Sequence, residues 1–186
     1  TGVQTCALPI CCPFNQKPDS CELECAKNVE TTIQTSTHGR IAGFIAEPIS
    51  GASLGAAAPP DDYWPAIREI CERFGVLLIV DEVLTGYGRT GRWWGIDHWQ
   101  VKPDIMVSAK GAAGGYFPFG FMAARGEDVE LVRRELGDFN HGGTFSHHAV
   151  GAAAGLAVLD ILQSEKLVER SAENGEYLGR ALQGEI

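Results

Sequence analysis

Short apolar segments alternate along this chain with amphipathic segments whose apolar positions recur at helical spacing. The apolar segments predict strands, and the amphipathic and small-residue segments predict helices. Strands are expected at Ile41–Glu47, Val76–Val83, Ile105–Ser108 and Phe119–Ala124, and helices at Cys21–Gln34, Asp61–Phe74, Asp128–Glu135, Ser146–Gln163 and from Glu165 onward. Gly-rich and polar loops separate these elements.

Two of the predicted helices carry recognisable end signals. Asp61 or Asp62 can cap the helix that runs to Phe74, and Gly75 can end it. Ser146 is the expected cap of the small-residue helix that follows the loop Gly137–Phe145.

The run Val76–Val83 is continuously apolar except for two acids near its end, which is typical of a strand covered on both faces. Strands that alternate with helices predict an α/β fold with a mostly parallel sheet and helices on both faces. Ligands of such sheets gather at the carboxyl ends of the strands. Glu47, Asp81, Glu82 and Lys110 fall at those ends, and they are the polar residues of greatest interest.

Composition narrows the class of protein. The chain has 186 residues, 45% of them hydrophobic, and a net charge of −9, which is globular rather than disordered composition. An acidic surface repels phosphates, so a nucleic-acid partner is not expected. The apolar runs are too short to cross a bilayer, so no membrane partner is expected either. A reduced set of cysteines suits a cytoplasmic protein.

The first ten residues, Thr1–Ile10 (TGVQTCALPI), resemble the translation of a common sequencing adapter. They are therefore expected not to belong to the folded protein. Cys6, which lies among them, would then be an artefact. The end of the chain, Arg180–Ile186, reads as the middle of a helix, so both ends are expected to be cut.

Asp81 and Lys110 form the constellation that carries chemistry. They are expected at the ends of neighbouring strands, and a bare buried carboxylate needs a cation or a strong donor. A plain Asp–Lys ion pair would meet that need. So would pyridoxal phosphate, which takes a lysine for its Schiff base and a carboxylate that keeps its ring nitrogen protonated.

The surrounding sequence resembles the class III aminotransferases, which are fold type I pyridoxal-phosphate enzymes, and more closely their ω-transaminase-like subgroup. The resemblance lies in IVDEVLTGYGRTG, VKPDIMVSAKGAAGGYFPFG and HGGTFSHHAVGAAAGLAVLDIL, preceded by AEPISGASLGAAAPPDDYWPAIREICERFG. The pieces CPF and CELECA near the start match as well. Together they extend from Cys12 to Ile186.

The resemblance implies specific roles around pyridoxal phosphate. Asp81 should bind the pyridine nitrogen, Val83 should pack on one face of the ring, and Lys110 should form the Schiff base. Thr144 should reach the cofactor phosphate of the other subunit of a homodimer with shared active sites. Glu47 should support the site from behind.

Glu82 is expected to support the site in the same way as Glu47, with Arg89 as a charge partner. The implied reaction is transamination from an amino acid or ω-amine donor to a keto acid or aldehyde acceptor.

This chain departs from the ornithine and GABA members of the family at two positions. Leu84 stands where those enzymes carry Gln, and Ala52 where they carry Glu. The second change favours an ω-amino acid or amine substrate. The family's phosphate-binding loop and carboxylate-binding arginine would lie outside residues 11–186, which therefore read as a partial cofactor-binding large domain.

Several alternatives stay open from the sequence. An aminomutase or a dialkylglycine decarboxylase shares the same scaffold. A non-catalytic metal-binding fragment could be built on the N-terminal cysteines Cys11, Cys12, Cys21 and Cys25, although they lack the paired spacing of a structural zinc site. Cys71 lies on an apolar helical stripe and reads as core.

Two further motifs are ambiguous. The sequence GYGRTG at Gly86–Gly91 fits a dinucleotide-binding fingerprint, but a Gly-ended aromatic stretch follows it where such a site needs a helix. Trp93, Trp94 and Trp99 can line a substrate tunnel or form a packed aromatic cluster at a dimer interface.

Overall fold

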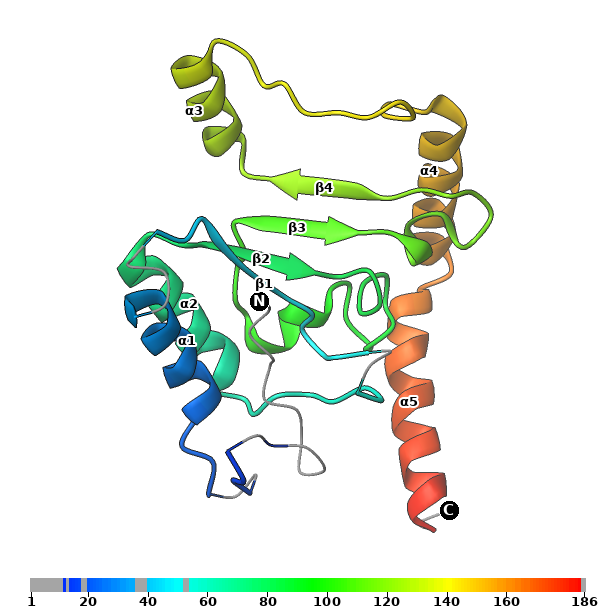
Figure 1. The fold of residues 1–186 in the computed structure, drawn as a ribbon. Helices are drawn as coiled ribbons and strands as arrows, with labels where there is room; N and C mark the ends of the chain where they lie inside the picture. The colour runs from blue at the N-terminus through cyan, green and yellow to red at the C-terminus, as the bar shows by residue number, and fades with distance from the viewer. Residues whose placement is uncertain (1–11, 13, 18–19, 36–39, 52–53, 185–186) are drawn as a thin grey trace.

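The computed structural model describes residues 12, 14–17, 20–35, 40–51 and 54–184. Residues 1–10, which are expected to be foreign, and Ala52, where the chain departs from the ornithine and GABA enzymes, lie outside the described residues. Figure 1 shows the elements α1 (Glu24–Thr35), β1 (Gly43–Ala46), α2 (Tyr63–Phe74), β2 (Leu77–Asp81), β3 (Ile105–Ser108), β4 (Phe121–Ala124), α3 (Gly126–Leu136), α4 (Ala149–Ser164) and α5 (Leu167–Gln183). Two 3-10 helices, η2 (Gly95–Trp99) and η3 (Lys110–Ala113), lie in the connections.

The four strands form one sheet in the order β1-β2-β3-β4. The first three strands are parallel, and β4 returns antiparallel to β3. Each predicted strand is present. Strand β3 has the predicted bounds, and the other three are shorter than their predicted runs. The prediction of an α/β fold with a mostly parallel sheet is confirmed.

Helices α1 and α2 cover one face of the sheet and form the main core with it (Figure 1). Trp64 and Ile67 of α2 and Leu78 and Val80 of β2 are fully buried. The opposite face is more open among the described residues, where Ile45 is 57% exposed. That openness on one face contrasts with the continuous apolar run, which by itself suggests burial on both faces.

The ends of α2 follow the sequence only in part. Gly75 adopts a left-handed conformation (φ 64°) and ends the helix as expected. Asp62 occupies the capping position, but its side chain makes no capping hydrogen bond.

Helix α4 begins three residues later than its polar signal predicts. His148 is its capping residue, because His148 Nδ1 accepts a hydrogen bond from the Gly151 N–H (3.4 Å). Ser146 does not cap the helix, since its Oγ accepts a hydrogen bond from the Gly143 N–H in the preceding loop (2.7 Å). Lys166, in a left-handed conformation (φ 50°), separates α4 from α5.

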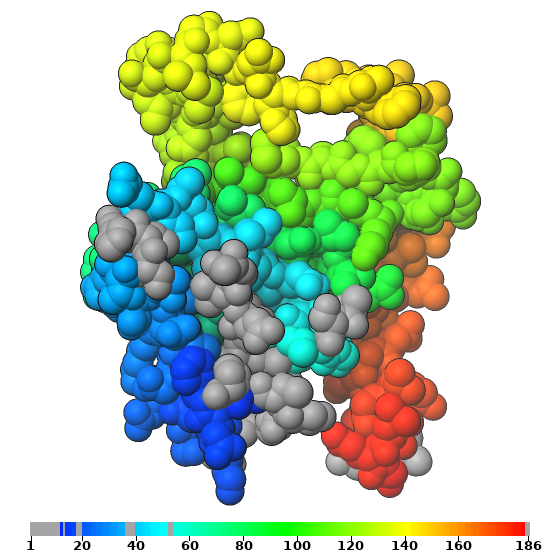
Figure 2. Space-filling model, viewed as in Figure 1, coloured from blue at the N-terminus to red at the C-terminus, as the bar shows by residue number. Residues whose placement is uncertain are grey.

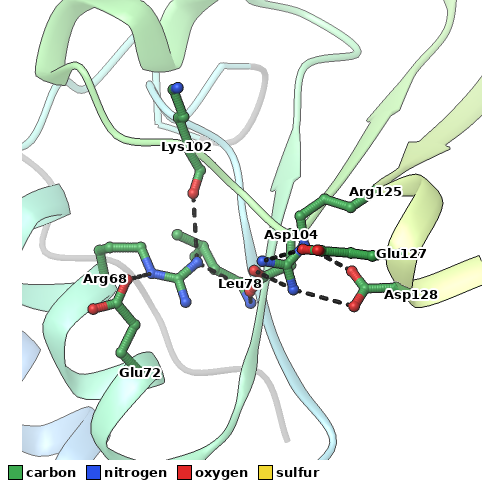
Figure 3. Close-up of polar contacts among 8 residues, drawn as sticks. All are labelled: Arg68, Glu72, Leu78, Lys102, Asp104, Arg125, Glu127 and Asp128. Carbon is green, nitrogen blue, oxygen red and sulfur yellow. Dashed lines mark hydrogen bonds and ion pairs between the residues drawn. The ribbon is translucent and has the colours of Figure 1, made fainter. Parts of the chain in front are cut away.

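A network of charged side chains surrounds the amino-terminal end of β3, which is opposite to the carboxyl end that precedes Lys110 (Figure 3). Asp104 is 5% exposed, and its Oδ2 accepts from Arg68 Nη1 (3.0 Å) and from the Leu78 N–H (2.7 Å). Its Oδ1 pairs with Arg125 Nη2 (3.3 Å). Arg125 also pairs with Asp128 at the start of α3 (2.8 Å). One buried carboxylate thus joins α2, β2, β3 and β4.

No helix within the described ranges is both long enough and apolar enough to span a membrane.

Candidate functional site

Asp81 and Lys110 lie at the carboxyl ends of neighbouring parallel strands. Asp81 ends β2 and stands opposite Val107 of β3. Lys110 follows the end of β3 and opens η3. Adjacent strands lie about 4.8 Å apart, so the two residues belong to the same carboxyl end of the parallel part of the sheet. The sequence prediction that they sit on neighbouring strand ends is confirmed.

The Asp81 carboxylate is held by its own turn. Its Oδ1 accepts a hydrogen bond from the Val83 N–H (2.9 Å), and the side chain is half-buried. The Glu82 N–H donates to the Val107 carbonyl oxygen (2.9 Å), which continues the strand pairing past Asp81. Asp81 and Val83 are therefore fixed to β3 through the residue between them.

Lys110 has an exposed side chain on a strained backbone. Its φ is 48°, in the left-handed region that a residue with a Cβ rarely adopts. Such a conformation costs roughly 1–3 kcal/mol and persists only where the surroundings enforce it. Ala112 and Ala113 of the same short helix are buried against α4, which anchors the segment.

Glu82 is a fully buried carboxylate that closes the loop after β2. Its Oε2 accepts from Thr85 Oγ1 (2.5 Å) and the Gly95 N–H (2.9 Å), and its Oε1 accepts from the Ile96 N–H (2.9 Å). Burial raises the pKa of Glu82, and these three donors partly oppose that rise. No ion pair joins Arg89 to Glu82 in the part of the chain that the structure describes, so the expected charge pairing is wrong.

Glu47 closes the turn after β1. Its Oε2 accepts from the Gly51 N–H (3.1 Å). A Cβ added at Gly51 would lie closer to Leu84 Cδ1 than van der Waals contact allows. The Leu84 side chain therefore packs directly against this turn. A cavity of about 990 Å³ opens between the two loops, with Leu84 and Trp99 among its lining residues.

Thr144 belongs to a long connecting loop and not to a strand end. It is exposed in the loop between α3 and α4, which runs along the rim of the molecule (Figure 2). No hydrogen bond or ion pair among the described residues joins it to Asp81 or Lys110. Asp81, Val83, Glu47 and Lys110 thus all lie at or just after the carboxyl ends of parallel strands, whereas Thr144 lies in a loop.

Comparison with known proteins identifies the family. The class III aminotransferase model matches residues 3–185. The chain belongs to the class III aminotransferases. The putrescine–pyruvate aminotransferase of Pseudomonas aeruginosa is 42% identical over 170 residues, which cover 91% of this chain and 37% of that enzyme. The leucine/methionine racemase of Thermococcus litoralis is 34% identical, over 92% of this chain and 38% of the racemase.

A solved transaminase structure from a study of ancestral reconstruction matches the fold with a TM-score of 0.86. It is 35% identical and covers 96% of this chain and 40% of its own. The chain thus spans well under half the length of these relatives.

Class III aminotransferases depend on pyridoxal phosphate, and the residues at this edge suit that group. A carboxylate and a primary amine lie at adjacent strand ends, and the apolar side chain of Val83 follows the carboxylate. The strained backbone at Lys110 is a second observation in favour, because strain of this kind gathers at functional sites.

The glycines of GYGRTG serve packing rather than phosphate binding in this class III aminotransferase. A Cβ at Gly88 would lie 3.0 Å from Val168 Cγ2, and one at Gly91 would lie 2.9 Å from Ala172 Cβ, both on α5. Both glycines have positive φ (83° and 81°). Bends and then the short 3-10 helix η2 follow Gly91, so this loop lacks the α-helix N-terminus that a dinucleotide site needs.

The ambiguous aromatic residues divide between core and cavity. Trp94 packs edge-on against Tyr87 at 5.2 Å. Trp99 lines the cavity and lies 6.4 Å from Trp64. Sequence reasoning overlooked Tyr87, whose only signal was a bulky residue inside a Gly-rich loop.

The cysteines show no metal centre. Among the described residues no group of three or more metal-ligating side chains is placed to hold an ion. Cys11 lies outside those residues. Cys71 is fully buried, which confirms its place in the core.

Proposed function

We propose that the full-length protein carrying this chain is a pyridoxal-phosphate-dependent transaminase. It would move an amino group from an amino acid or ω-amine donor to a keto acid or aldehyde acceptor. The observation that carries the proposal is the placement of Asp81 and Lys110 at adjacent strand ends, with Lys110 in a strained conformation. The likeness to an enzyme named for putrescine and pyruvate supports a terminal amine as donor.

Bound pyridoxal phosphate supplies an electron sink that stabilises negative charge on the carbon bearing the substrate amine. The Asp81 carboxylate would hold a proton at the ring nitrogen, and the Val83 side chain would pack on the ring face. Lys110 Nζ would hold the cofactor and, once released by substrate, would take a proton from that carbon and return it at a neighbouring position.

Three further roles are proposed from the same site. Glu47 keeps the turn after β1 in place through Gly51. Thr144 would contact the cofactor phosphate of the second subunit in a homodimer, and its exposure on the rim leaves it free for that contact. The cytoplasmic location stays a prediction from the sequence.

The test replaces Lys110 by Ala in the full-length protein, with Lys102→Ala as the matched control because Lys102 is also exposed. Loss of turnover together with the visible absorbance of bound cofactor is expected only for Lys110→Ala. Retained transamination in that variant would overturn the proposal.

A related reaction on the same cofactor is a second candidate, supported by the relative named as a racemase. An aminomutase, a dialkylglycine decarboxylase or a racemase differs in its products. Incubation with the donor alone separates the mutase and the racemase, since intramolecular transfer or loss of optical activity then occurs in many turnovers. Release of CO₂ identifies the decarboxylase. Transamination stops after one turnover per site without an acceptor.

A further inference from the structure

We propose that Tyr87 is a positioning residue that holds Lys110 in its strained conformation and so aims the Lys110 amine at the cofactor. The inference rests on the proposed function, because it concerns the readiness of that amine to capture pyridoxal phosphate.

Tyr87 is itself held firmly in the loop after β2. Its N–H donates to the Trp93 carbonyl oxygen (2.8 Å), and its ring meets the Trp94 ring edge-on at 5.2 Å. Tyr87 also has positive φ (59°), which is unusual for a bulky side chain. The loop therefore keeps the Tyr87 ring in one place at a cost in backbone strain.

The ring contacts the chain just after Lys110. A Cβ added at Gly111 would lie 3.1 Å from Tyr87 Cδ2 and 3.5 Å from its Cβ. The Tyr87 side chain thus lies directly against the Gly111 backbone and limits the paths by which the chain can leave Lys110.

The hydroxyl end contacts the chain just before Lys110. A hydrogen bond joins the Tyr87 hydroxyl to that of Ser108, which is 3% exposed. Ser108 Oγ also contacts the Glu82 carbonyl oxygen, to which it donates at 3.4 Å. Burial raises the pKa of Tyr87, so the phenol stays protonated at neutral pH and keeps its hydrogen-bonding capacity.

One side chain therefore touches both flanks of Lys110. Relaxation of Lys110 to an ordinary negative φ would change the direction of its Cα–Cβ bond relative to the preceding strand. Because Tyr87 restrains Ser108 and Gly111 together, removal of Tyr87 should release that relaxation. A contact that served packing alone would change stability without changing the reactivity of the Lys110 amine.

The experiment uses the full-length protein stripped of cofactor, with Tyr87→Phe and Tyr87→Leu as the two variants. Tyr177→Leu is the matched control, because Tyr177 is 60% exposed on α5. The first readout is the rate at which pyridoxal phosphate restores the visible absorbance. The second is the rate of Lys110 reductive methylation by formaldehyde and cyanoborohydride, mapped by mass spectrometry relative to Lys102.

Tyr87→Leu is expected to slow cofactor capture roughly 10–100-fold, the loss typical of a supporting residue. Tyr87→Phe, which loses only the hydroxyl, should slow it roughly two- to tenfold. The rate of Lys110 methylation should change together with the rate of cofactor capture in both variants. The rate of Lys102 methylation should stay unchanged, and the Tyr177→Leu control should match the parent in both readouts.

Capture by Tyr87→Phe at the parent rate, with parent-like Lys110 methylation, would overturn the inference even if Tyr87→Leu failed to fold. The proposed function would survive that result. It would fall instead if the parent protein showed no visible band that depends on Lys110.

Discussion

Asp81 and Lys110 lie at the carboxyl ends of adjacent parallel strands, because Asp81 stands opposite Val107 on β3 and Lys110 follows the end of that strand. The parallel register of β2 and β3 produces this juxtaposition, and the antiparallel β4 takes no part in it. A shift of the register by one residue would turn Asp81 to the opposite face of the sheet.

Asp81→Asn should reduce kcat by roughly 10²–10⁴-fold, the range for a group that assists proton transfer. The amide still accepts the Val83 N–H through its oxygen, so the turn is preserved. It cannot hold a proton at the ring nitrogen as a carboxylate does. Steady-state kinetics of the full-length protein, with cofactor content measured in parallel, check this. A kcat within threefold of the parent would contradict the proposed role.

Glu82→Gln should lower the free energy of unfolding by about 1–3 kcal/mol, since the amide NH₂ must face one of the buried N–H groups of Gly95 and Ile96. The loss should depend on pH. Burial raises the folded-state pKa of Glu82 above 4.5, so the folded protein holds the proton more tightly than the unfolded one.

The stabilisation linked to that proton is complete below about pH 4.5 and is lost as the pH rises through the raised pKa. The gap in stability between parent and Glu82→Gln should therefore narrow as the pH rises. Urea unfolding at pH 5 and pH 8 measures it. A gap that widens toward pH 8 would refute this linkage.

Asp104→Asn should destabilise the protein by about 2–4 kcal/mol, because it removes a buried charge that faces two guanidinium groups. The hydrogen bond from the Leu78 N–H can survive on the amide oxygen. Asp128→Asn is the control, since Asp128 pairs with Arg125 nearer the surface and should matter less. Equal losses from the two variants would argue against a central role for Asp104.

Gly88→Ala and Gly91→Ala should each cost roughly 1–3 kcal/mol, because the added methyl meets α5 at 3.0 Å or less and both positions have positive φ. Gly175→Ala within α5 is the matched control. An added Cβ there meets nothing within 4 Å, and alanine favours a helix, so stability should rise by up to about 1 kcal/mol. Melting temperatures compare the three. Neutral effects at Gly88 and Gly91 would show that α5 does not rest on this loop.

Cys71 should resist alkylation in the folded protein. Burial raises its pKa to about 11, so almost no thiolate exists near neutral pH, and the side chain is fully buried. Cys21, which is partly exposed, should react first with iodoacetamide at pH 8. Peptide mapping after limited labelling gives the order. Equal labelling of both thiols before unfolding would contradict the burial of Cys71.

Local patterns predicted most of the elements but not their limits. The helix ending at Gly75 and the apolar run of β2 were recognisable because their signals lie within one turn or one strand. The start of α4 was predicted wrongly, since Ser146 is drawn to Gly143 and His148 takes its capping place. The His148 ring also packs against the Phe117 ring at 4.8 Å, a contact that no local pattern records.

The candidate site shows the same division. Asp81, Glu82 and Lys110 stand out in the sequence because each is a charged residue at the end of an apolar run. Tyr87 and the pairing of Glu82 with Gly95 and Ile96 do not, because these contacts join separate segments of the chain. The glycines of GYGRTG were conspicuous, but their function in packing against α5 required coordinates.

The amino-acid sequence by itself determined the class of fold, the family motifs and the charged groups at the strand ends, since periodicity and residue type are local properties. Only the tertiary structure decided the register between the strands and which residues restrain Lys110. It also decided that the buried Glu82 takes neutral donors instead of a cation. These outcomes arise from close packing between segments that are distant in the sequence. There, a methyl group or one hydrogen bond selects among arrangements that are all compatible with the sequence pattern.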